Sequence, residues 1–491
     1  MNSLRLSCLR RCAWFAVILL SGLLTAGDAF GQQASPAPDA PPKGDPKSNA
    51  DFAAAADEVL GQMSEITGLT LESPLKKSLR SREEIRAYVI RQMNEDQTPE
   101  ERYADAKSAE AFGLLPRGFD LDSFMVELLT EQIAGLYDPK AHEFYIADWI
   151  PLQDQRMVMA HELTHALEDQ HFQIEAWLKA AKPNGDAELA REAVLEGSAM
   201  AAMVDYLLQG TGQSLKNLPE FDPSMFVGDL GSSPTLQKAP QFIKDGLIFP
   251  YFGGMTFTAA ILKPRGWSAL PGVFTNPPLS TQQIMHPALY LAGKKPEKIE
   301  APALDKLLGA QWKHLDEDIL GEFGWKEVLK QFLGEDRAKP LAAAWIGDRY
   351  VLYENKQTKR LLLATHLRLA SEEQASRFFG QYSEALEKKY DERSNLLRRP
   401  NFFSFDTPDR GVFLRCVGTD CVTLEGGDRE IFAEVNKQLN WSALPEAPRY
   451  PAQLPASTAG HLIPAGAHAT TTAAGRAGHA ITPASRSAAS F

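Results

Sequence analysis

Two histidines and a glutamate lie together in the segment His161-Glu162-Leu163-Thr164-His165. On an α-helix, residues four positions apart share one face, so the imidazoles of His161 and His165 point the same way. Two neighbouring imidazoles suit two ligands of a tetrahedral Zn²⁺ ion. Glu162 stands beside the first histidine, where it can take a proton from a water that the metal activates. The segment therefore predicts a zinc site with a general base.

A catalytic zinc site usually has three protein ligands and one open position. We expect Glu196, in a second predicted helix, to be the third ligand. The residues after it, Gly197-Ser198-Ala199, are small and favour a close approach of this helix to the first one. Glu192 lies one turn earlier on the same face and is the alternative ligand. We expect Glu192 instead to accept a hydrogen bond from a ligand imidazole.

His171 has the spacing of a third histidine ligand in the metzincin pattern His-Glu-x-x-His-x-x-Gly-x-x-His. That pattern uses its glycine to end the helix, but Glu168, a good helix former, occupies the position here. If the helix continues, His171 lies about 15 Å along the axis from His161. His171 is therefore not expected to bind the metal.

The segment from His161 to Ala166 resembles the His-Glu-x-x-His motif of zinc metallopeptidases. With a glutamate ligand on a following helix, it is similar to the gluzincins, the thermolysin-like class. The chain also resembles a group of exported bacterial zincins. The stretches that carry this likeness are HELTHALEDQHF at 161–172, Glu196-Gly197, FPYFG at 249–253, PLSTQQIMHP at 278–287 and WIGDRY at 345–350. The resemblance implies hydrolysis of peptide bonds with one catalytic Zn²⁺.

Two features depart from the thermolysin-like pattern. Those enzymes have an aspartate four residues after the glutamate ligand, whereas this chain has Met200. We expect Asp169 or Glu192 to support the ligands instead. The Gly-x-Met-Glu-Asn motif of one aminopeptidase branch is also missing, since Gly254-Met255 is followed by threonine. An endopeptidase is therefore favoured.

Peptide hydrolysis also needs a hydrogen-bond donor for the negative charge that develops on the carbonyl oxygen. The candidates are His286, Tyr251 and Tyr137, with His286 slightly preferred. Each has a simpler interpretation. His286 precedes a proline and could cap a helix, and both tyrosines could serve only in packing.

The N-terminus predicts export. Arg5, Arg10 and Arg11 precede an apolar run at 13–25 that is short for a membrane span, and Ala29-Phe30-Gly31 offers small residues for cleavage. We interpret residues 1–31 as a signal peptide, with an uncleaved anchor as the alternative. The mature protein is expected in the periplasm or outside the cell, without a membrane span.

The charge balance argues against nucleic acids as partners. The 491 residues carry 51 Lys and Arg against 63 Asp and Glu, a net charge of −12 that becomes −14 without residues 1–31, which hold three arginines and one aspartate. Phosphate contacts need clustered Lys and Arg. The expected partner is a peptide or protein substrate, and the sequence does not indicate the oligomeric state.

The length predicts two domains, because single cores stop growing at about 250–300 residues. Residues 32–50, rich in Pro and Ala, are expected to form a flexible linker, and residues 451–491 a disordered tail. The predicted fold class is α+β. A mainly helical, zincin-like domain with a small edge sheet at 51–295 precedes a smaller α+β domain at 300–447.

Local patterns predict the main elements. The expected elements are helices at 53–67, 82–94, 99–112, 121–134, 155–180, 187–208 (capped by Asp186), 325–333 and 372–389, a hairpin at 135–146, and strands at 349–354 and 361–368. Cys416 and Cys421 flank a predicted turn between two strands, so we expect a disulfide across a hairpin. A zinc-binding pair is the weaker alternative, since no further ligands lie nearby.

Two other functions remain open. The protein could be a secreted, zinc-binding interaction protein with weak catalysis, or a hydrolase of cell-wall peptide amides. A structural zinc site has no use for Glu162, which favours an enzyme. A cell-wall hydrolase would use the same residues.

Overall fold

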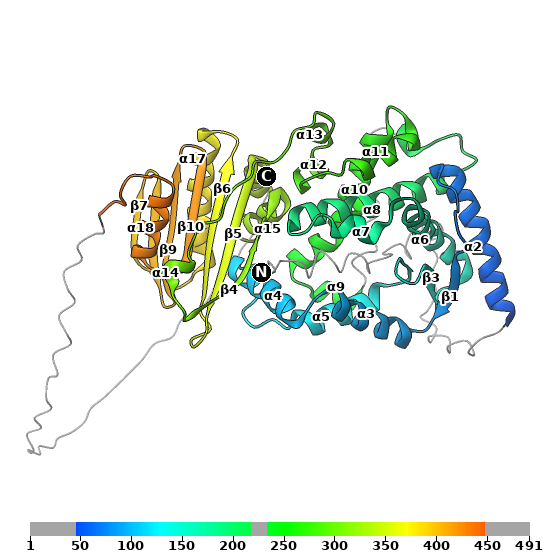
Figure 1. Ribbon diagram of the computed structural model, residues 1–491, viewed down its shortest axis with the longest axis horizontal. Helices are drawn as coiled ribbons and strands as arrows, with labels where there is room; N and C mark the ends of the chain where they lie inside the picture. The colour runs from blue at the N-terminus through cyan, green and yellow to red at the C-terminus, as the bar shows by residue number, and fades with distance from the viewer. Residues whose placement is uncertain (1–45, 218–232, 447–491) are drawn as a thin grey trace, which may run out of the picture. The chain divides into compact units, whose positions relative to one another are not determined.

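The computed structural model describes residues 46–217 and 233–446. They form the helices and strands that Figure 1 shows. These described residues belong to one compact unit. The predicted signal peptide at 1–31, most of the expected linker and the tail at 451–491 lie outside the described residues. Helix α2 (Pro46–Thr67) begins inside the range expected to be a linker.

Helices dominate the first half of the described chain, as the sequence predicted. Helices α3 (Arg82–Asp96) and α4 (Pro99–Phe112) each begin with a capping box, formed by Ser81 with Glu84 and by Thr98 with Glu101. The other helices here are α5 (Leu121–Gln132), α6 (Leu152–Phe172), α7 (Ile174–Lys179), α8 (Gly185–Leu207), α9 (Pro234–Lys238), α10 (Gln241–Leu262), α11 (Leu270–Thr275), α12 (Thr281–Met285), α13 (Pro287–Leu291) and α14 (Asp305–Leu308).

A small sheet accompanies these helices. Strands β2 (Gly135–Asp138) and β3 (Glu143–Ala147) form the predicted hairpin, and β3 pairs in parallel with β1 (Lys76–Arg80) on its other side. Strand β1, with the sequence Lys-Lys-Ser-Leu-Arg, was not predicted because only one of its residues is apolar. Within the described chain, β2 pairs with β3 alone, so its other edge is open to the helices.

Helices α6 and α8 differ from their predicted bounds. The single helix expected over 155–180 is wrong, because Gln173 adopts a left-handed conformation with φ of 50° and separates α6 from α7. The prediction that Asp186 caps α8 is also wrong. Asn184 is the cap, since its side chain accepts a hydrogen bond from the N–H of Ala187.

Helices α8 and α10 cross at two glycines. A Cβ atom on Gly197 would lie 2.0 Å from the carbonyl carbon of Gly254, and one on Gly254 would lie 1.8 Å from the oxygen of Ala193. The small residue at 197 therefore permits contact with α10, whereas the sequence suggested contact with α6. Helix α10 also contains Pro250.

An antiparallel sheet of seven strands forms the C-terminal part (Figure 1). Its order is β4 (Trp312–Asp318), β5 (Trp345–Asn355), β6 (Leu361–Leu369), β10 (Asp420–Gly427), β9 (Arg410–Val417), β8 (Phe402–Thr407) and β7 (Ser394–Arg399). The associated helices are α15 (Gly321–Leu333), α16 (Glu335–Ala342), α17 (Glu372–Lys389) and α18 (Arg429–Gln438). Both predicted strands and both predicted helices of this region are confirmed.

The β9–β10 hairpin carries the predicted disulfide. Cys416 and Cys421 occupy opposite positions in the two strands and are bonded to each other. Gly418, with φ of +61°, provides the left-handed turn residue between them. The alternative of a zinc-binding cysteine pair is therefore wrong.

The start of α8 contacts the beginning of this C-terminal part. Asp318, the last residue of β4, accepts a hydrogen bond from the N–H of Gly185 at 2.9 Å. The carboxylate of Asp186 accepts from the backbone N–H of Thr281 at 3.1 Å and lies so close to Gly321 that a Cβ there would be 1.8 Å away. Both ends of these contacts are buried.

None of the helices in residues 46–217 and 233–446 combines the length and the apolar character that crossing a bilayer requires.

Candidate metal centre

Three nitrogen and oxygen atoms from two helices meet inside the described chain. The Nε2 atom of His161 lies 3.1 Å from Nε2 of His165 and 3.1 Å from Oε2 of Glu196, and His165 Nε2 lies 3.6 Å from the same oxygen. The histidines come from α6 and the glutamate from α8. All three side chains are buried. The structure thus brings together the three residues that the sequence proposed as ligands.

The spacing of these atoms suits a tetrahedral ion. Ligands at about 2.1 Å from zinc, in tetrahedral directions, are about 3.4 Å apart. The three observed separations lie within a few tenths of an ångström of that value. Two imidazole nitrogens and one carboxylate oxygen are also the ligand set of known catalytic zinc sites. The residues therefore fit a zinc ion by both chemistry and geometry.

The charge of the centre also favours a cation. In the described part of the chain, no lysine or arginine forms an ion pair with Glu162, Glu168 or Glu196. Burial raises the pKa of Glu168, and it lowers the pKa of His161. Burial would also raise the pKa of Glu196, but hydrogen bonds from the two histidines outweigh it and hold that pKa below its ordinary value.

Glu162 is held by the edge strand. Its Oε2 atom accepts a hydrogen bond of 2.7 Å from the backbone N–H of Tyr137 in β2. Because that N–H points towards α6, it is on the edge of β2 that does not pair with β3. Burial raises the pKa of Glu162 to about 8. The backbone of one element thus fixes the carboxylate of another beside the metal ligands.

Glu168 supports His165, a role that the sequence did not reveal. Its Oε2 atom lies 3.3 Å from Nδ1 of His165, and its other oxygen accepts from the hydroxyl of Ser198 on α8. With Nδ1–H directed at Glu168, the lone pair of Nε2 faces the centre. Burial would lower the pKa of His165, but its hydrogen bonds to the carboxylates of Glu168 and Glu196 outweigh burial and raise that pKa. The sequence did contain a signal for this contact, because His165 and Glu168 are three positions apart on one helix and so share a face.

Neither expected supporting residue is seen to hold a ligand imidazole. Asp169 accepts from the hydroxyl of Tyr137 at 2.8 Å and from the N–H of Ile174 at 3.1 Å, so it holds the edge strand and the start of α7. A small pocket lies over the centre and is lined by Tyr137, Glu162, His165, Ile174, Glu192, Leu195 and Glu196. Glu192 is therefore part of its wall. In the described residues, Nδ1 of His161 has no hydrogen-bond partner. This agrees with Met200 at the position where thermolysin-like enzymes have aspartate.

The two tyrosine candidates lie close to the centre. The ring of Tyr251 stacks on that of His161 with 6.0 Å between centroids. Burial, followed by the charges of Glu196 and Glu162, raises the pKa of Tyr251, so its phenol stays a proton donor. Tyr137 lines the pocket, and its hydroxyl is bonded to Asp169.

His286 and His171, the two other histidines considered from the sequence, lie outside the candidate metal centre. His286, the preferred donor from the sequence, joins α12 to α13, where its Nε2 atom lies 2.8 Å from Glu322 of α15. It is not among the residues that line the pocket, because that carboxylate draws it towards the C-terminal part. The hydrogen bond with Glu322 raises the pKa of His286. His171 remains on α6, and its Nε2 atom contacts the carbonyl oxygen of Thr70 at 2.8 Å.

Comparison with known proteins gives one match. Residues 309–436 match a family described as a domain of unknown function, DUF8575. This region runs from just before β4 into α18 and includes none of the residues of the metal centre. No curated protein and no solved structure matches the chain.

Proposed function

We propose that this protein is an exported zinc metallopeptidase of the gluzincin type. The observation that carries the proposal is the joint placement of three ligand atoms and a general base. His161, His165 and Glu196 present atoms 3.1–3.6 Å apart, and Glu162 stands beside them in a defined orientation. An ion held only for structure requires no such base.

The proposed ligands are His161, His165 and Glu196. A zinc ion bound there would supply a Lewis acid that polarises a carbonyl and lowers the pKa of a water. The protein contributes the second requirement, a carboxylate that accepts a proton and returns it to the leaving amine. Glu162 fills this role, and the N–H of Tyr137 keeps its carboxylate oriented during both transfers.

Tyr251 is the donor we assign to the developing negative charge on the substrate carbonyl oxygen. It is buried against His161, and its raised pKa keeps the proton on the phenol. Such donors act most strongly where water is excluded. The substrate would enter the pocket over these residues, which Tyr137, Glu162, His165 and Glu196 line.

The test compares the protein with its Glu162→Gln variant. Metal content is measured on purified protein, and cleavage is followed on casein and on cell-wall peptides. We expect about one zinc per chain in both proteins and a loss of cleavage of at least about 10³-fold in the variant. Glu127→Gln, which changes an exposed carboxylate on α5, is the matched control and should behave as the wild type.

Each outcome separates the alternatives. Cleavage of cell-wall peptides without casein would assign the same site to amide hydrolysis in the cell wall. If the zinc-loaded wild type cleaves neither substrate, the peptidase proposal fails and a zinc-binding interaction protein remains.

A further inference from the structure

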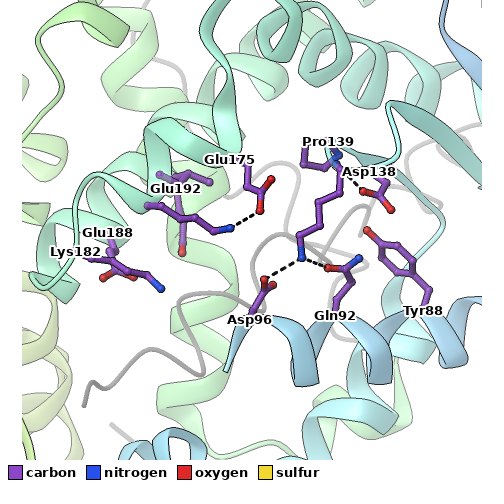
Figure 2. A pocket seen from close by; sticks show the side chains of 12 residues that line it. Tyr88, Gln92, Asp96, Asp138, Pro139, Glu175, Lys182, Glu188 and Glu192 are labelled. Atoms are coloured by element: carbon purple, nitrogen blue, oxygen red, sulfur yellow. Dashed lines mark hydrogen bonds and ion pairs between the residues drawn. The ribbon is translucent and has the colours of Figure 1, made fainter. Parts of the chain in front are cut away.

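The structure contains a second pocket, and Figure 2 shows the side chains that line it. Its walls come from α3, from the turn after β2, from α7 and from the first half of α8. Glu192 lines both this pocket and the one over the metal ligands. Because Glu192 precedes Glu196 by one helical turn, the second pocket begins next to the candidate metal ligands.

Helix α8 presents a row of carboxylates towards these pockets. Glu188, Glu192 and Glu196 are spaced by four residues, so they lie on one face of the helix. All three are buried, with no more than 6% of each residue exposed. Like charges on successive turns repel each other, and more strongly where water is scarce. A positive charge entering the pocket would reduce this repulsion.

The remaining charges of the pocket leave its acidic character in place. Asp138, at the end of β2, is also buried and lines it. Of the three lysines, Lys140 pairs with Asp96 at 3.2 Å and Lys179 pairs with Glu175. Dashed lines end at the labelled Asp96 and Glu175 in Figure 2. Only Lys182 adds a further positive charge to the lining. The lining thus contains five carboxylates against three lysines.

Apolar groups complete the pocket. Tyr88, Pro139 and Leu178 provide hydrophobic surface beside the carboxylates. Lysine and arginine side chains have this combination of properties, since an apolar stem carries a charged end. A purely aliphatic side chain would match only the apolar part of the lining, and the carboxylates would repel an acidic side chain.

We propose that this pocket binds a lysine or arginine side chain of the substrate, next to the bond that is cleaved. The inference rests on the proposed peptidase function and adds a substrate class to it, namely peptides with a basic residue beside the scissile bond. Because Glu192 lines both pockets, a peptide bound over the metal ligands would place a neighbouring side chain in this second pocket.

The test uses zinc-loaded full-length protein and internally quenched peptides that differ at one position. Lysine, arginine, norleucine or glutamate is placed in turn on each side of the scissile bond, in one set of peptides with both ends blocked and in a second set with a free amino terminus. We expect kcat/KM to be at least about tenfold higher for lysine than for norleucine on one side of the bond. The ratio should fall as salt is raised, because ions screen the attraction.

Two variants of the pocket should change this ratio in opposite directions. Glu188→Gln removes a carboxylate and should lower the lysine-to-norleucine ratio at least about threefold, whereas Lys182→Gln removes a competing charge and should raise it. The ratio is measured within one protein sample, so partial misfolding cancels. If Glu188→Gln does not fold, the salt dependence of the ratio and the ratio in Lys182→Gln still test whether the pocket binds a basic side chain.

The outcomes distinguish the two proposals. Cleavage with no preference for a basic residue, or with equal ratios in all variants, overturns the pocket assignment and leaves the peptidase in place. A requirement for a free amino terminus would mean that the pocket binds that amine, and would also overturn it. If no peptide is cleaved by the zinc-loaded wild type, the proposed function itself fails.

Discussion

The Nδ1 atom of His165 lies 3.3 Å from a carboxylate oxygen of Glu168, whose other oxygen is held by Ser198 from the neighbouring helix. A ligand imidazole oriented in this way keeps one tautomer and one ring direction. Because Ser198 follows Glu196 by two residues, the same stretch of α8 supplies a ligand and steadies another. These hydrogen bonds therefore join α6 and α8 at the candidate metal centre.

Loss of the Glu168 carboxylate should weaken metal binding. We expect Glu168→Ala to lower zinc affinity about 10- to 100-fold and Glu168→Gln to lower it less, since the amide oxygen still accepts a hydrogen bond. Ser198→Ala should give a smaller decrease. Competition with a zinc-binding dye measures the affinities, and Glu127→Gln is the control. Unchanged affinity in Glu168→Ala would contradict the role of this residue.

Metal removal should lower thermal stability. In the described part of the chain, no lysine or arginine pairs with the buried carboxylates of Glu162, Glu168 and Glu196, so a bound zinc ion would stabilise the folded chain. At zinc concentrations about 1,000 times the dissociation constant, the gain is about 4 kcal/mol. Thermal unfolding with zinc or with a chelator measures this difference. His161→Ala should show almost no response to either, and a wild-type protein that ignores both would refute the site.

Replacement of Tyr251 by phenylalanine separates the packing role of its ring from the proposed role of its hydroxyl as a hydrogen-bond donor. The variant keeps the ring that stacks on His161 but loses the phenol proton. We expect kcat/KM to fall about 10²-fold while zinc content is unchanged, because the donor acts on charge that develops during the reaction. Steady-state kinetics on casein-derived peptides gives the answer. Full activity in the variant would assign Tyr251 to packing alone.

Gly197 and Gly254 should not tolerate larger residues. A Cβ on either glycine would overlap the backbone of the other helix, so Gly197→Ala must separate α8 from α10. We expect a loss of about 3 kcal/mol in the free energy of unfolding, together with weaker zinc binding. Gly246→Ala is the matched control, because it is also on α10 and has open space around its Cβ position. That variant should gain about 0.5–1 kcal/mol.

The sequence predicted the residues whose positions follow from local spacing. The placement of His161 and His165 depends only on the period of one helix, and the hairpin with Cys416 and Cys421 depends on a turn between two strands. The bounds of α17 were predicted for the same reason, since its apolar face repeats regularly after a serine cap. These features needed no knowledge of distant parts of the chain.

Tertiary contacts were harder to predict. The hydrogen bond from Tyr137 to Glu162 uses a backbone N–H, which leaves no mark in the residue type. Gly197 was assigned to the wrong neighbour because a small residue does not indicate which helix it meets. His286 was preferred as a donor, yet Glu322, remote in the sequence, draws it away from the centre. Each error concerns which distant segment arrives beside a residue.

The contacts at the start of α8 connect the C-terminal sheet to Glu196, the candidate ligand on the same helix. Asp318 and Gly321 fix Gly185 and Asp186, and Glu196 lies ten residues further along the same unbroken helix, about 15 Å away. A rigid rod transmits a shift at one end to the other. The region that matches DUF8575 therefore holds the N-terminal end of the helix that carries Glu196. A protein that exchanged this region would have to readjust the position of that carboxylate as well.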